Sequence, residues 1–187
     1  MILSEKSLNS LQYKNLLVLD LFSYGSALSI INQFVDDDQI KVFEISPVGS
    51  AATLVLWIRD FLTASVLKKE IESQFKSSFH SVSLVENLHE ELLPIYLSQK
   101  QGLLCKKMLI AESNSLAGSV FAADAGLKEN YSLVDFRVVR TYPKNVILIF
   151  SADHFKTSFI ESLQQKDFHL TQIDQLNGAL KAYFEII

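Results

Sequence analysis

The sequence has one cysteine, no long apolar run and no excess of basic residues. Cys105 alone cannot form an intrachain disulfide, and the chain has no group of cysteines that could hold a zinc ion or an iron–sulfur cluster by thiolates alone. Apolar runs such as 54–58 and 146–150 are five residues long, against the roughly twenty that cross a bilayer. Residues 1–15 lack the apolar core of a signal peptide. We therefore expect a cytoplasmic protein with no membrane contact.

The charge balance argues against a nucleic-acid partner. Seventeen Lys and Arg against 21 Asp and Glu give a formal charge of −4, so no broad basic field exists to hold a phosphate backbone. The hydrophobic fraction is 49% and the charged fraction 20%, which is apolar for a globular protein. We expect contacts between subunits to bury this extra apolar surface.

Residues with catalytic or metal-binding chemistry are scattered. His89, Glu90 and Glu91 are adjacent, so on a helix their side chains point apart. The run 36–38 of three Asp lacks the glycine turn and distal Glu of a calcium loop. Neither glycine pattern for phosphate binding occurs. We therefore expect no enzyme activity, no catalytic residue, no metal and no cofactor.

The chain repeats itself over about half its length. Residues 16–29 read LLVLDLFSYGSALS, an apolar strand ending in an acid, then Ser and a helix entry, and residues 108–121, MLIAESNSLAGSVF, have the same order. Asp20 aligns with Glu112 and Ser23 with Ser115, both at an offset of 92 residues. Segments 61–63 and 155–157 continue the match at an offset of 94. A repeat of this length indicates two similar domains.

Apolar periodicity and turn residues predict the order strand, helix, strand, strand, helix, strand and short helix in each half. The fold class is α/β, two tandem ferredoxin-like α/β sandwiches, with domains at 15–98 and 107–187 and a linker at 98–106. Ser23 and Ser115 are expected as helix N-caps. The predicted elements lie near 15–22, 24–35, 39–46, 52–59, 61–75, 80–86 and 88–98, and near 107–113, 115–129, 131–140, 145–151, 153–165, 168–174 and 175–185.

The helix sequence at 121–130, FAADAGLKEN, has few large apolar side chains. Small residues such as Ala122 and Gly126 imply the close approach of either a neighbouring sheet or another copy of the protein.

Several stretches resemble the bacterial microcompartment shell domain. FAADAGLKEN is similar to that family's first helix, an alanine-rich run ending in Lys at the edge between tiles. LVLWIRDFLTAS, at 54–65, is similar to its third strand leading through Arg and Asp into the second helix. SVSLVENLHEELLP, at 81–94, is similar to its closing strand and helical tail. The duplication resembles the tandem-domain class of this family.

The resemblance implies a structural shell protein whose three copies form a pseudohexagonal tile with a threefold pore for small polar or anionic metabolites. Its partners would be itself, as a homotrimer, and other shell proteins of the microcompartment. Some tandem members carry a cluster-binding Cys at the position of Ser46, so no cofactor is expected here. The resemblance places Asp36, Lys128 and Arg59 at the tile edge, and it implies that the pore is lined by Ser46, Pro47, Val48, Gly49, Ser50, Tyr142, Lys144 and Asn145.

A second hypothesis is a soluble regulatory or small-ligand-binding protein made of two ferredoxin-like modules. Fold analogy alone does not separate it from a shell protein. Lys128 and the strand exit at Arg59 and Asp60 favour the shell protein, because tiling uses them and a ligand sensor does not require them.

Overall fold

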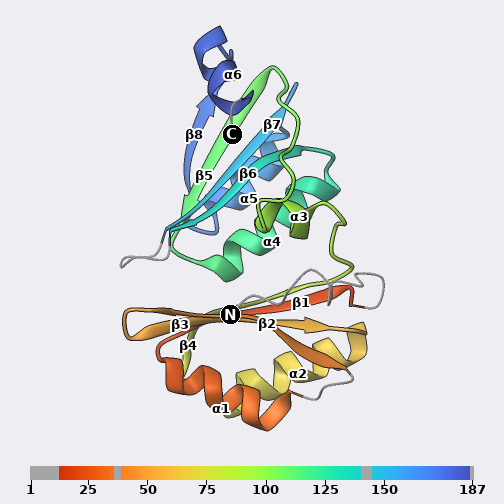
Figure 1. Ribbon diagram of the computed structural model, residues 1–187, viewed down its shortest axis with the longest axis vertical. Coiled ribbons are helices and arrows are strands. Elements are labelled where there is room, and N and C mark those ends of the chain that lie inside the picture. The colour runs from red at the N-terminus through yellow and green to blue at the C-terminus, as the bar shows by residue number, and fades with distance from the viewer. Residues whose placement is uncertain (1–12, 36–38, 140–144, 186–187) are drawn as a thin grey trace. The chain divides into compact units, whose positions relative to one another are not determined.

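The computed structural model describes residues 13–35, 39–139 and 145–185. These form two four-stranded sheets, the first in the order β2-β3-β1-β4 and the second in the order β6-β7-β5-β8 (Figure 1). The elements of the first repeat are β1 (Asn15–Leu21), α1 (Tyr24–Phe34), β2 (Ile40–Val48), β3 (Ala51–Ile58), α2 (Phe61–Gln74), β4 (Phe79–Val85) and α3 (Leu92–Tyr96). Those of the second are β5 (Lys107–Ser113), α4 (Leu116–Lys128), β6 (Ser132–Val139), β7 (Asn145–Ala152), α5 (Thr157–Gln164), β8 (His169–Ile173) and α6 (Gly178–Glu185).

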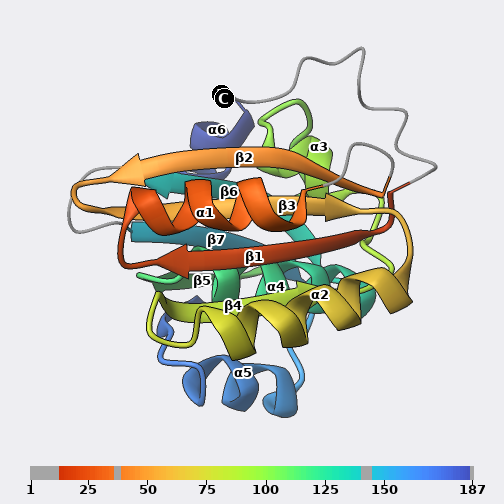
Figure 2. The same ribbon diagram turned by 90° about the horizontal axis from the view of Figure 1, so that it is seen from below.

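The first sheet buries alternate residues of its central strands against two helices. Leu17, Leu19 and Leu21 of β1 belong to one core cluster with Ile30 of α1 and Ile71 of α2. Because strand side chains alternate between faces, these three leucines share the face that the helices cover. Figure 2 shows α1 and α2 running along this face.

Polar side chains fix where the helices of the first repeat begin. The Ser23 hydroxyl accepts the Ser26 N–H at 3.1 Å, as predicted for an N-cap. The Asp60 carboxylate accepts the Thr63 N–H at 2.9 Å at the start of α2. The Thr63 hydroxyl and N–H hold the pKa of Asp60 below its ordinary value of 3.8, because both hydrogen bonds favour the charged form.

The thin helix α4 packs closely on its own sheet. A Cβ atom at Gly126 would lie 2.4 Å from the Phe150 ring of β7, which is shorter than any real contact. Ala122 and Ala123 are also buried. The small residue at Gly126 is therefore explained by a neighbouring sheet, the first of the two alternatives that the sequence left open.

The residues cluster into two compact units that do not follow the repeat boundary strictly. Of the described residues, one unit holds 13–35, 39–88, 115–121 and Val139, and the other holds 89–114, 122–138 and 145–185. The first part of α4 thus belongs with the first sheet, and the rest of that helix with the second.

The predicted α/β fold and the order of its elements are confirmed. One helix differs in extent, since the segment predicted as helical over 88–98 is helical only over α3. Asn87 has a left-handed backbone, with φ 47°, and the Leu88 N–H donates to the Lys14 carbonyl at 2.8 Å. These contacts keep the start of the segment out of the helix.

Candidate functional site

The hairpin between β2 and β3 holds the first group of predicted pore residues. Residues 46–48, predicted as part of a turn, are paired with residues 51–53 within the sheet. Pro47 is tolerated because β2 is an edge strand, where a missing N–H costs no ladder bond. Gly49 and Ser50 make the turn, and the left-handed backbone of Gly49, with φ 62°, suits glycine.

Ser46 is bonded within its own strand. Its hydroxyl donates to the carboxylate of Glu44, which is buried at 1% exposure. The register between β2 and β3 shifts between Val42 and Glu44. Such a bulge changes the direction in which the following side chains point.

The second group of predicted pore residues lies between β6 and the start of β7 along the chain. Asn145 is the first residue of β7 and is partly buried. Tyr142 and Lys144 lie outside the described residues, and so does the predicted edge residue Asp36.

The predicted edge residue Lys128 is held on its own helix. Its ammonium pairs at 2.5 Å with the carboxylate of Asp124, one turn earlier. Asp124 is 5% exposed and also accepts the His89 N–H at 2.8 Å. The buried carboxylate thereby fixes the ammonium, whose side chain remains 43% exposed, near the end of α4.

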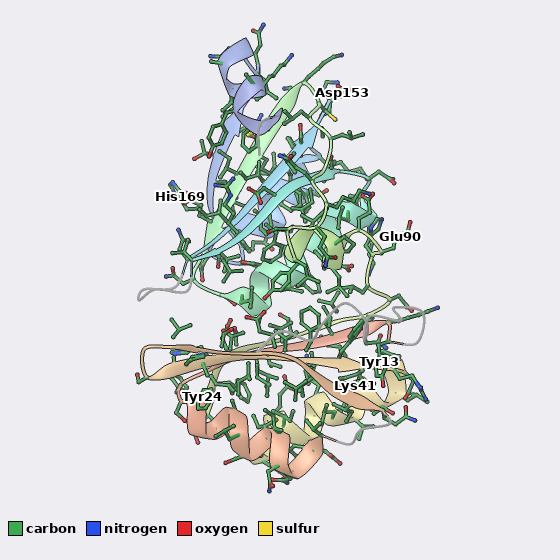
Figure 3. The ribbon with its side chains drawn as sticks, viewed as in Figure 1. Tyr13, Tyr24, Lys41, Glu90, Asp153 and His169 are labelled. Carbon is green, nitrogen blue, oxygen red and sulfur yellow. The ribbon has the colours of Figure 1, made fainter. Side chains whose placement is uncertain are left out.

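Arg59, the other predicted edge residue, lies beside an aromatic ring. Its guanidinium carbon is 5.7 Å from the centroid of the Tyr13 ring, and the Lys41 ammonium is 5.2 Å from the same centroid. Figure 3 labels Tyr13 and Lys41 at this place. Two cations on one ring form a small positive surface at the exit of β3.

The second unit contains an open groove with a volume of about 830 Å³. Its lining includes His89, Glu91, Cys105, Asp153 and His154. Among the described residues, however, no group of three or more His, Cys, Asp or Glu is placed to hold a metal ion. The groove therefore presents polar side chains to which a small molecule could bind.

One buried carboxylate of the first unit, to which the sequence assigned no role, accepts four hydrogen bonds. Asp20, 5% exposed, accepts hydrogen bonds from the hydroxyls of Thr53 at 3.1 Å and Ser81 at 2.9 Å. It also accepts the Ser115 hydroxyl at 2.9 Å and the Ala117 N–H at 3.1 Å. Asp20 thus caps the start of α4 together with Ser115. The sequence signal for this role was the acidic residue near the end of the first strand of each repeat, Asp20 and Glu112.

Comparison with solved structures identifies the fold. A microcompartments protein from Desulfitobacterium hafniense DCB matches with a TM-score of 0.66 and 16% identity, over 90% of this chain and 98% of that one. The chain has the fold of a microcompartment protein. This confirms the fold that the sequence resemblance implied, over nearly the whole of both chains.

A crystal structure of a putative glycine cleavage system transcriptional repressor also matches, at 8% identity and a TM-score of 0.31, over 86% of this chain and 98% of that one. That similarity is too low to support an argument about this chain. No protein-family model matches the sequence, and no curated protein matches it. None of the described helices is long and apolar enough to cross a membrane.

Proposed function

We propose that this chain is a structural, non-enzymatic shell protein of a bacterial microcompartment, and that three copies form a pseudohexagonal tile. The observation that carries the proposal is the duplicated fold, which is shared with a microcompartment protein over 98% of that protein's length. Two repeats in each of three chains supply six similar units around one axis, the number that a hexagonal tile needs. The apolar composition supports the same conclusion, because obligate oligomers cover apolar surface.

The tile is proposed to contain a threefold pore lined by the two hairpins. Ser46 and Ser50 would contribute hydroxyls and Asn145 an amide, which can replace part of a polar solute's hydration. Lys144 would add one positive charge from each copy, and a ring of fixed positive charge concentrates anions. We therefore propose that small polar or anionic metabolites pass through the pore. Lys128 and Arg59 are proposed to meet other tiles of the shell, together with Asp36.

The tile is tested by negative-stain electron microscopy of the purified protein, with its mass measured by light scattering. We expect flat hexagonal particles or sheets, and a mass three times the 21.1 kDa of the chain. A monomer at micromolar concentration would contradict the proposal. The pore is tested separately with Lys144→Glu, which should reverse the charge preference of tiles placed in a planar lipid bilayer while the particles keep their shape.

The groove of the second unit supports a second candidate function, the binding of a small ligand by a regulatory protein. Its volume suits a small molecule. A screen of anionic and polar metabolites by thermal shift tests this candidate. A ligand that raises the melting temperature of wild type, with the increase lost in Lys100→Ala, would favour it, whereas hexagonal particles would favour the tile.

A further inference from the structure

The strand registers show which residues of the two repeats are equivalent near the start of the first strand. Leu16 of β1 lies opposite Trp57 of β3, and Met108 of β5 lies opposite Ser151 of β7. Ser151 therefore stands in the second repeat where Trp57 stands in the first. A small hydroxyl side chain has the place of a large aromatic ring.

The residues that precede the two strands are equivalent in the same way. Tyr13 lies two residues before β1, and Cys105 lies two residues before β5. The Trp57 Nε1–H donates to the Tyr13 carbonyl at 2.8 Å. The Cys105 N–H donates to the Ser151 hydroxyl at 2.7 Å. Cys105 thus contacts Ser151 as Tyr13 contacts Trp57, and a thiol has the place of a second ring.

Two aromatic rings and a cation occupy this place in the first repeat. The centroids of the Tyr13 and Trp57 rings are 5.4 Å apart, and the two residues are 7% and 1% exposed. The guanidinium carbon of Arg59, which follows β3, lies 5.7 Å from the Tyr13 centroid. The first repeat therefore packs ring on ring here and sets a positive charge against them.

The groove of about 830 Å³ lies at the equivalent place in the second repeat. Cys105 and Ser151 both line it, and all of its lining residues belong to the second unit. Leu127 and Tyr131, which are 3% and 6% exposed, also line it. A groove of this size, beside two small side chains that replace two rings, has room for a flat aromatic molecule.

The charge that follows the third strand is reversed between the repeats. Asp153 follows β7 as Arg59 follows β3, and it lines the groove (Figure 3). Its carboxylate lies 3.9 Å from the Lys106 ammonium, and both side chains are well exposed. The Lys100 ammonium in the lining is paired with Glu91. The acid at position 153 therefore complements a positive charge on a ligand.

We propose that the groove binds a small cationic aromatic compound, a planar ring system that carries an ammonium group or a protonated ring nitrogen. The ring lies beside Cys105 and Ser151, at the place that aromatic rings take in the first repeat, and the positive charge faces Asp153. The inference names the ligand class of the second candidate function, so it rests on that candidate and not on the tile.

The first test compares three probes by chemical-shift titration of the isotope-labelled protein. Tryptamine has an indole ring and an ammonium group, n-butylamine has the ammonium without the ring, and indole-3-propionate has the ring with a carboxylate. We expect tryptamine to bind about tenfold more tightly than n-butylamine, because the ring leaves water. It should bind about threefold more tightly than indole-3-propionate, because an exposed ion pair adds little.

Three variants assign the binding to the groove. Asp153→Asn should weaken tryptamine about threefold and leave indole-3-propionate at least as tightly bound, because the carboxylate no longer attracts or repels the ligand. Asp167→Asn is the matched control, since Asp167 is outside the lining and its left-handed backbone, with φ 59°, accepts asparagine. Cys105→Tyr restores the side chain of the first repeat and should weaken tryptamine at least about tenfold by filling the groove.

The second test uses the unaltered protein. Cys105 is the single cysteine of the chain, so its alkylation by N-ethylmaleimide can be followed by mass spectrometry. At ten times its dissociation constant, tryptamine should slow the alkylation about tenfold, because about a tenth of the sites stay free. The same concentration of n-butylamine should leave the rate unchanged.

The results separate this inference from both proposed functions. Tryptamine that binds no more tightly than n-butylamine, or that leaves the alkylation of Cys105 unchanged, overturns the site. Equal effects of Asp153→Asn and Asp167→Asn on tryptamine overturn the role of the charge and with it the ligand class. An anionic ligand that is lost in Lys100→Ala would keep the second candidate function and overturn this inference. The tile is judged separately by the mass and shape of its particles.

Discussion

The outer faces of the two sheets carry equivalent residues in different surroundings. Val18 and Asp20 of β1 are 0% and 5% exposed, whereas Ile110 and Glu112, at the same positions of β5, are partly exposed. The start of α4 accounts for the difference, since it belongs with the first sheet and caps itself on Asp20. On the second sheet, Ile110 packs instead against a cluster that includes Leu176 and Phe184.

The largest effect is expected from a substitution on the outer face of the first sheet. Asp20→Ala removes the acceptor of three hydroxyls and one N–H, of which Thr53 and Ala117 are buried and Ser81 and Ser115 partly buried. We expect the free energy of unfolding to fall by about 3 kcal/mol, because buried partners lose a charged hydrogen-bond acceptor. Glu112→Ala should change it by less than about 0.5 kcal/mol in dissociated protein. Urea unfolding of dilute samples measures both, and equal losses would contradict the distinction between the faces.

The next largest effect on stability is expected from substituting two helix glycines, one in each repeat. Gly126→Ala would place a methyl group against the Phe150 ring, and overpacking of this kind costs about 1–3 kcal/mol. Gly25→Ala has room, since its Cβ would meet the Ser23 hydroxyl at 3.8 Å. In dilute protein we expect it to be neutral or to stabilise α1 by up to about 1 kcal/mol, because alanine favours helix. Thermal unfolding measures the pair, and a loss for Gly25→Ala as large as that for Gly126→Ala would count against the open surface.

The N-caps of α1 and α4 allow the same comparison between an exposed and a covered helix start. Ser23→Ala removes one cap from an open helix start and should cost about 1 kcal/mol. Ser115→Ala also removes a donor to the buried Asp20, so we expect about 2 kcal/mol. Chemical unfolding of both variants below the concentration of association gives the order, and a larger loss for Ser23→Ala would contradict it.

The smallest effect concerns pH. The lowered pKa of Asp60 means that its cap stabilises the folded state above the unfolded pKa near 3.8, and that this contribution is lost as pH falls through the lower folded value. Asp60→Asn keeps an acceptor oxygen without the charge. We expect its melting temperature to lie slightly below wild type at pH 7 and to converge with it in acid. A constant difference across this range would exclude the carboxylate charge as the cause. Lys156, which precedes α5 in the second repeat, makes no side-chain cap.

The sequence predicted the order of elements because apolar periodicity and the repeat reinforced each other. It also placed Ser23 and Ser115 at helix starts. It missed the role of Asp20, because the partners of that carboxylate lie 33, 61, 95 and 97 residues away along the chain. Only the fold brings them together. The turn at 46–50 was predicted too long, since pairing with β3 continues to Val48. The predicted roles of Lys128 and Ser46 in the tile stay predictions.

Amide hydrogen exchange tests the central claim most directly, that Asp20 caps the start of α4 whereas the start of α1 is exposed. The Ala117 N–H is bonded to Asp20 within the chain and should be protected at every protein concentration. The Gly25 N–H should exchange rapidly in dilute protein, and Asp20→Ala should make the Ala117 N–H exchange faster as well. Equal protection of Gly25 and Ala117 in dilute wild-type protein would contradict the account.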